Sequence, residues 1–121
     1  MLKIKSVFRN KIPVVYTIDG RGISPPLTIS NVPMDARNLI VTIYDPDAEN
    51  FIHLNEVTPL TSRIPEGYFK TYIPPSPPLG SSHRYIFGVT ATGIYGRRLD
   101  EGSFVGTYKR KKKWYFQRIH Y

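Results

Sequence analysis

Proline and glycine divide this chain into short segments. Eleven prolines and nine glycines occur among its 121 residues, and no stretch shows apolar side chains repeating at helical spacing. Because proline interrupts both helices and central strands, only short elements fit between these breaks. The segments carry alternating or β-branched residues, which predicts about six to nine short strands and favours an antiparallel sandwich or barrel over an α/β fold.

Several of these segments have the pattern of strands. Residues 38–44 are rich in β-branched side chains and almost continuously apolar, so we expect a central strand covered on both faces. One helical turn is expected near residues 97–101, and the aromatic run 114–119 is expected to pack as a last strand. The other predicted strands are residues 2–7, 14–18, 51–57, 68–73, 85–92 and 103–108.

Length and composition indicate one soluble domain covering residues 1–121, which we expect to be cytoplasmic. The chain is 40% hydrophobic and 21% charged. No apolar run approaches the roughly 18 residues of a membrane span, and the first residues lack the apolar stretch of a signal peptide. Because there is no cysteine, disulfide frameworks, thiolate metal sites and cysteine nucleophiles are excluded.

The positive charge is concentrated at one end. The formal net charge is +8, but residues 97–121 hold eight basic and two acidic side chains, whereas the first 96 residues are nearly neutral. The segment 109–121 begins with the basic run Lys109, Arg110, Lys111, Lys112 and Lys113 and continues with aromatic residues. That combination is typical of single-strand nucleic-acid or anionic-surface binding, although a solvated lysine-rich turn before a packed strand is the alternative that we favour.

Asp45 and His53 are the first candidate site residues. Asp45 follows the predicted central strand and precedes a proline, which holds its carboxylate at the strand end. A simple Asx turn is the alternative interpretation. His53 lies among apolar neighbours and needs a hydrogen-bonding partner if it is buried, a role that Asp45 could fill.

The second candidate stretch is residues 74–85. A rigid proline-rich segment, residues 74–78, leads into Gly80, where the missing side chain allows a ligand or another backbone to approach closely. His83 and Tyr85 lie on one face of the next strand because they are two residues apart. A lone histidine is more often structural, but one carboxylate and two imidazoles would form a small polar pocket suited to anions. A metal site at Asp45, His53 and His83 is a further alternative.

Enzyme activity is not expected. Ser81 and Ser82 precede His83, but neighbours on a strand point to opposite faces, and the chain has no nucleophile-elbow motif. No cofactor is expected either.

These residues together resemble the phosphatidylethanolamine-binding proteins, also called Raf kinase inhibitor-like proteins. The order and spacing of the motifs agree with the family pattern over residues 14–110, and the last motif, at 106–110, is similar to that of prokaryotic members. The resemblance implies an all-β antiparallel sandwich with little or no helix, a large central sheet, a smaller second sheet and a shallow anion pocket. The matching motifs are SPPLTISNVP at 24–33, DPDA at 45–48, FIHL at 51–54, PPLGSSHRY at 77–85 and GTYKR at 106–110. The implied ligand-binding residues are Asp45, His53, Pro78, Gly80, His83 and Tyr85.

The resemblance implies non-catalytic binding of a small anion or a phosphorylated, phospholipid head-group-like ligand. The donors would be histidine N–H groups and backbone amides near Gly80. Three positions depart from the family pattern, namely Glu49, Phe51 and Pro74, and the chain is too short to carry the family's usual helix before residue 106. Inhibition of a protease, modulation of a kinase, and a homo-oligomer that completes the pocket remain alternatives.

Overall fold

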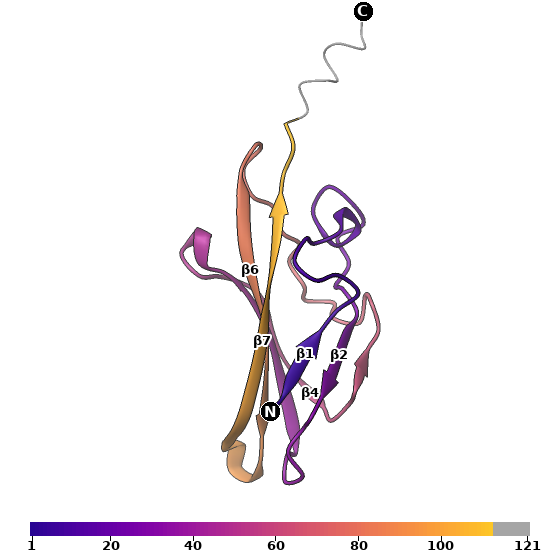
Figure 1. The fold of residues 1–121 in the computed structure, drawn as a ribbon, viewed down its shortest axis with the longest axis vertical. Helices are drawn as coiled ribbons and strands as arrows, with labels where there is room; N and C mark the ends of the chain where they lie inside the picture. The colour runs from indigo at the N-terminus through magenta and orange to yellow at the C-terminus, as the bar shows by residue number, and fades with distance from the viewer. Residues whose placement is uncertain (113–121) are drawn as a thin grey trace, which may run out of the picture.

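The computed structural model describes residues 1–112 and consists of two antiparallel sheets. The larger sheet has the strand order β4-β3-β6-β7, and the smaller has the order β1-β2-β5 (Figure 1). The all-β sandwich predicted from the sequence is therefore confirmed. The strands are β1 (Lys3–Lys5), β2 (Leu27–Ser30), β3 (Asn38–Asp45), β4 (Phe51–Pro59), β5 (Arg63–Ile64), β6 (Ser82–Thr92) and β7 (Arg98–Lys109), and the single 3₁₀ turns are η1 (Val14–Tyr16), η2 (Pro46–Ala48) and η3 (Ile94–Gly96).

The core lies between the two sheets. Alternate residues of β3 face inward and pair with inward residues of β6, as in Val41 opposite Val89 and Ile43 opposite Phe87. The smaller sheet contributes buried Ile4 and Ile29 to the same cluster. Non-directional burial of these apolar faces is what holds the layers together.

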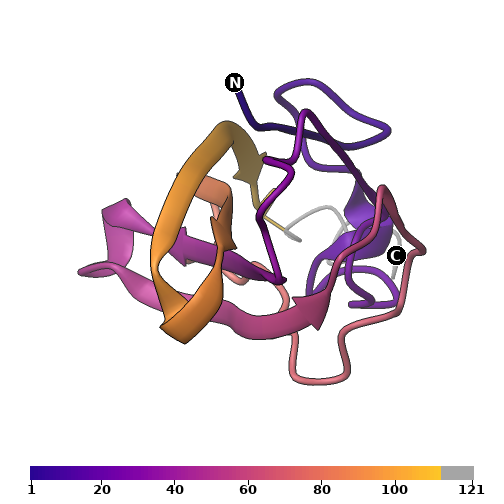
Figure 2. The same cartoon turned by 90° about the horizontal axis from the view of Figure 1, so that it is seen from below.

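The outer face of the larger sheet is only partly covered. β3 is an inner strand, as predicted, but its outward residues Ile40, Thr42 and Tyr44 are half-buried and line an open groove of about 840 Å³. The expectation that both faces of this strand are covered is therefore wrong. Figure 2 shows the curvature and twist of this sheet from below.

Three local predictions fail. Residues 14–18 contain η1 instead of a strand, because Tyr16 N–H donates to the carbonyl of Pro13 at 3.1 Å and closes a turn. Residues 68–73 are irregular, with a turn at 70–71, and Phe69 N–H donates to the distant Ser24 Oγ at 3.1 Å instead of to a neighbouring strand. The helical turn expected at residues 97–101 is mostly the start of β7, and the 3₁₀ turn lies just before it, at Ile94–Gly96.

Arg110, which follows β7, remains hydrogen-bonded to the residues just before β6. Gly80 N–H donates to the Arg110 carbonyl at 2.6 Å and Arg110 N–H donates to the Ser81 carbonyl at 3.0 Å, so the β6–β7 pairing extends past both strands. The predicted last strand at 114–119 and Lys113 lie outside the described residues. Within residues 1–112, no helix has the length and apolar character needed to cross a membrane.

Candidate functional site

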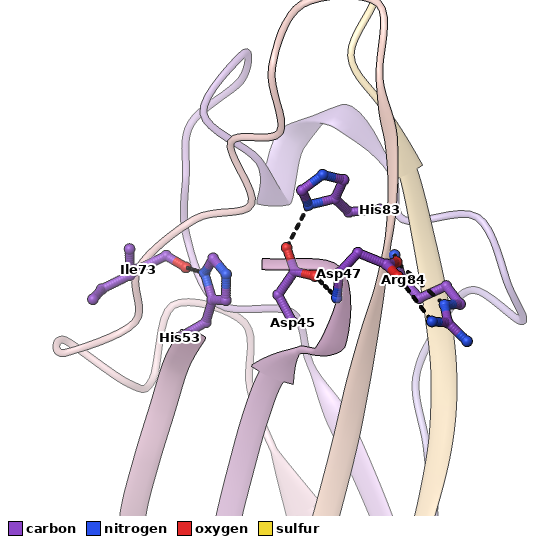
Figure 3. A network of polar contacts seen from close by, with 6 residues as sticks. All are labelled: Asp45, Asp47, His53, Ile73, His83 and Arg84. Atoms are coloured by element: carbon purple, nitrogen blue, oxygen red, sulfur yellow. Dashed lines mark hydrogen bonds and ion pairs between the residues drawn. The ribbon is translucent and has the colours of Figure 1, made fainter. Parts of the chain in front are cut away.

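Asp45 ends β3 and uses each carboxylate oxygen for a different task. Its Oδ1 accepts a hydrogen bond from Asp47 N–H at 2.8 Å, which starts the η2 turn at Pro46. Its Oδ2 accepts from His83 Nδ1 at 2.6 Å (Figure 3). The Asx turn, which was the alternative interpretation of Asp45, therefore coexists with a hydrogen bond to His83 in one side chain that is 2% exposed.

His53 faces the same region because β4 contains a bulge. Ile43 pairs with Leu54 and Tyr44 pairs with Ile52, so His53 is the extra residue and is buried together with Leu54. A bulge of this kind re-aims one side chain without changing the rest of the strand.

The partner of His53 is the carbonyl of Ile73, at 2.7 Å from Nδ1. A carbonyl can only accept, so Nδ1 carries the hydrogen, and the neutral ring presents a lone pair at Nε2. The expected His53–Asp45 pair is therefore wrong, since Asp45 binds His83 instead. Burial lowers the pKa of His53, opposed by the bond to Ile73 and the charge of Asp45.

Tyr85 lies between the two imidazoles. Its ring centroid is 5.3 Å from that of His53 and 6.4 Å from that of His83. The side chain is fully buried, and its hydroxyl has no hydrogen-bond partner among the described residues. Burial, followed by the negative charges of Asp45 and Asp47, raises the pKa of Tyr85, so the hydroxyl keeps its proton and needs an acceptor.

An Asp47–Arg84 pair, which the sequence reasoning missed, fixes the turn that carries Asp45. Arg84 Nη2 donates to Asp47 Oδ1 at 2.8 Å, while the Arg84 backbone N–H donates to Oδ2 at 2.7 Å (Figure 3). These bonds from Arg84 lower the pKa of Asp47 to about 2. The only sequence signal was the alternation of His83 and Arg84, which places them on opposite faces of β6 and lets each contact one aspartate.

Pro78 and Gly80 shape the adjoining turn and do not offer ligand donors. Ser81 N–H donates to the Pro78 carbonyl at 2.9 Å, and the Gly80 amide is already bonded to Arg110. The expectation that the Gly80 amide receives an anion is therefore wrong. Gly80 is nevertheless required for its conformation, because its φ of +84° is disfavoured for residues with a side chain.

The departures from the family pattern have local structural explanations. Glu49 has a φ of +54°, a value that the ring of proline cannot adopt. The Phe51 ring packs edge-on against His53, with centroids 4.8 Å apart, and supplies an aromatic wall. Pro74 packs close to Gly22, where an added Cβ would lie 3.0 Å from the proline ring.

The structure thus brings Asp45, His53, His83 and Tyr85 together at one end of the larger sheet. Asp45 and Tyr85 are buried, and the side chain of His83 is 16% exposed. The rings of His53 and His83 lie on Tyr85, with centroids 5.3 and 6.4 Å from its ring, so the three polar side chains are neighbours. Within residues 1–112, no three His, Asp or Glu side chains have an arrangement that could hold a metal ion.

Comparison with known proteins identifies the family. The family model described as phosphatidylethanolamine-binding protein matches residues 5–115. A UPF0098 protein from Archaeoglobus fulgidus is 37% identical over 115 residues, covering 74% of this chain but only 39% of its own length. UPF0098 proteins from Chlamydia trachomatis and Escherichia coli (YbhB) are 35% and 34% identical, with 69% of each relative covered.

Two solved structures have a fold similar to that of this chain. A Chlamydia trachomatis homologue of phosphatidylethanolamine-binding protein superimposes with a TM-score of 0.80 and 26% identity, covering 91% of this chain and 98% of that one. Escherichia coli YbcL gives a TM-score of 0.79 at 18% identity and supports the fold alone. The chain belongs to the phosphatidylethanolamine-binding protein family.

Proposed function

We propose that this protein binds a small phosphorylated ligand, without turning it over, at the site formed by Asp45, His53, His83 and Tyr85. The observation that carries the proposal is the hydroxyl of Tyr85, which is buried between two imidazoles and has no acceptor within residues 1–112. A buried hydroxyl without a partner costs stability, and a ligand oxygen would recover that cost.

The donors and acceptors of the site match a phosphate group. Tyr85 offers a donor, and His83 offers a second donor at Nε2 when its ring is protonated against Asp45. Neutral His53 presents an acceptor at Nε2, which a protonated phosphate oxygen satisfies, and after protonation it presents a donor. A carboxylate at neutral pH has only acceptors, whereas inorganic phosphate keeps a P–OH group at about pH 6.5 and so fits both states of His53. The names of the family and of the chlamydial structure refer to phosphatidylethanolamine, a phosphate diester, so they support recognition of phosphate oxygens and not of one type of ester.

The same arrangement favours binding over catalysis. Within residues 1–112, no serine or threonine hydroxyl is hydrogen-bonded to either imidazole, although Ser81 and Ser82 are close in sequence. A nucleophile activated by histidine would need such a bond. The role of His83 is therefore proposed to be donation of a hydrogen bond to the ligand.

The test is a titration with inorganic phosphate at about pH 6.5, in which binding is monitored through the NMR signals of the imidazole rings. We expect both rings to shift, and Tyr85→Phe to weaken binding about tenfold, the effect of losing one hydrogen bond to a charged group. Tyr95→Phe is the matched control, because Tyr95 is 99% exposed in the β6–β7 turn. Unchanged affinity in Tyr85→Phe, or no response of the wild-type rings to phosphate, would contradict the proposal.

His83→Ala separates this function from a pocket-independent role. Inhibition of a protease or kinase through an exposed loop should survive the substitution, whereas phosphate binding should be lost. Retained phosphate binding in His83→Ala would count against the site.

A further inference from the structure

The formal charges around the site are largely compensated by one another. Three carboxylates each have a basic partner: Asp45 with His83, Asp47 with Arg84, and Asp19 with Arg110. His53 is buried, and the desolvation that this brings disfavours its charged form. These pairs therefore supply hydrogen bonds but little net positive charge for a doubly charged ligand.

Residues 109–112 of the basic run lie beside the chain that leads into His83. The backbone bonds that join Arg110 to Gly80 and Ser81 place residues 109–112 beside the turn that precedes His83. Tyr108 and Arg110 both contact Asp19, at 2.5 and 3.2 Å, so these alternate residues face the same side of the segment. Extending this alternation past Lys109, where β7 ends, we infer that Lys112 faces this side and that Lys109 and Lys111 face the other.

Lys112 occupies the space that the missing side chain of Gly80 leaves. A Cβ built on Gly80 would lie 2.9 Å from Lys112 Cε and 3.4 Å from Cγ, so the lysine stem lies directly over this glycine. Lys112 is exposed and has no carboxylate partner among residues 1–112. It therefore brings an uncompensated ammonium group to the turn three residues before His83.

We propose that Lys112 is a further ligand-binding residue of the phosphate site and that it makes the site selective for phosphate monoesters over phosphate diesters. This inference rests on the proposed function. A monoester carries close to two negative charges near neutral pH, whereas a diester carries one. The paired groups and the Tyr85 hydroxyl provide hydrogen bonds to either ligand, and the lysine adds attraction that grows with the second charge.

The experiment compares methyl phosphate with dimethyl phosphate at about pH 7.5 and low ionic strength, with affinities measured by NMR titration. The wild-type protein is expected to bind methyl phosphate more tightly. Lys112→Ala should weaken methyl phosphate binding about fivefold, as expected for a partly exposed charge pair, and change dimethyl phosphate binding less than about twofold. Lys111→Ala is the matched control, since it removes the same charge from the other side of the segment, and should leave both affinities unchanged.

The outcomes separate the two proposals. If Lys111→Ala weakens methyl phosphate binding as much as Lys112→Ala does, or if neither substitution matters, the role of Lys112 is refuted. If Tyr85→Phe still weakens both ligands in that case, the phosphate site stands without the selectivity. If the wild-type protein binds neither ligand, both proposals fail. Lys112→Arg should retain the preference for the monoester, because it keeps the charge.

Discussion

The hydroxyl of Tyr85 gives a prediction of unusual sign. Replacing a buried tyrosine by phenylalanine usually breaks a hydrogen bond and destabilises a protein, but the Tyr85 hydroxyl has no partner within the described residues. Tyr85→Phe should therefore stabilise the ligand-free protein while weakening its affinity for phosphate. Stability and binding are expected to change in opposite directions.

The magnitude follows from two opposing terms. Leaving a buried hydroxyl unsatisfied costs about 1–3 kcal/mol, and removing it recovers that cost. The substitution opens a cavity of about 10 Å³, which at about 24 cal/mol per Å³ costs only about 0.2 kcal/mol. The net gain is about 1–3 kcal/mol, because Tyr85 is 0% exposed and its ring contacts are retained. For a domain of this length, that corresponds to a rise in Tm of about 3–11 °C.

Thermal unfolding in a phosphate-free buffer measures the effect, and Tyr72→Phe is the matched control. Tyr72 is also buried, but its hydroxyl donates to the Tyr16 carbonyl at 2.6 Å, so its removal should lower the Tm. At a phosphate concentration of about 100 times the dissociation constant, the wild-type protein should gain about 2.7 kcal/mol, and Tyr85→Phe much less. A fall in Tm for Tyr85→Phe similar to that for Tyr72→Phe would refute the reasoning, because it would show that the hydroxyl is already satisfied by the folded chain.

Two further predictions concern the titration of His53 and the space around Gly102 and Gly96. Because burial lowers the pKa of His53, the unfolded chain binds a proton at this residue at a higher pH than the folded chain does. The free energy of unfolding should therefore fall as the pH drops from about 7 through the ordinary histidine pKa of about 6.5. His53→Asn, which keeps a donor for Ile73, should show a shallower loss in urea unfolding between pH 7.5 and pH 5.5; an equal loss would exclude His53 as its source. Gly102→Ala should destabilise the protein by more than about 2 kcal/mol, because its Cβ would lie 2.4 Å from the Leu2 carbonyl oxygen. Gly96→Ala, with nothing within 4 Å but a φ of +73°, should cost only about 1 kcal/mol in the same denaturation assay, and equal losses would contradict the packing argument.

The sequence predicted the long strands better than the short elements. β3, β4, β6 and β7 contain eight or more residues each, so their patterns of apolar and β-branched residues are extensive enough to be recognised. β2 and β5 contain four and two residues and were missed. The β-branched run at 14–15 suggested a strand, but two other hydrogen bonds hold the segment differently. Gly22 N–H donates to the Val15 carbonyl at 2.9 Å and folds the chain back, and Ile18 N–H donates to the distant Pro75 carbonyl at 3.1 Å.

The residues of the site were predictable, but their pairing was not. Asp45, His53, His83 and Tyr85 follow from the family resemblance and lie together. The partner of each histidine depends on strand register, and the β4 bulge that turns His53 inward has no signal in the local sequence. The sequence gives no sign that the Gly80 amide donates to the Arg110 carbonyl, so this amide was expected to be available to a ligand.

Within the described part of the basic run, residues 109–112, the side chains are not equivalent, and this bears on how their charge should be interpreted. Arg110 is bound to Asp19 and to the turn at 80–81, so its charge is compensated within the fold. The stem of Lys112 lies over Gly80, beside the turn that leads to the proposed phosphate site, and by strand alternation we infer that Lys109 and Lys111 face the other side. If the segment bound nucleic acid through its overall charge, the three lysines would contribute nearly equally and affinity would fall steeply with salt. The proposed site instead predicts that one lysine matters and its neighbours do not, so single alanine substitutions at 109, 111 and 112 distinguish a general electrostatic surface from an extension of the pocket.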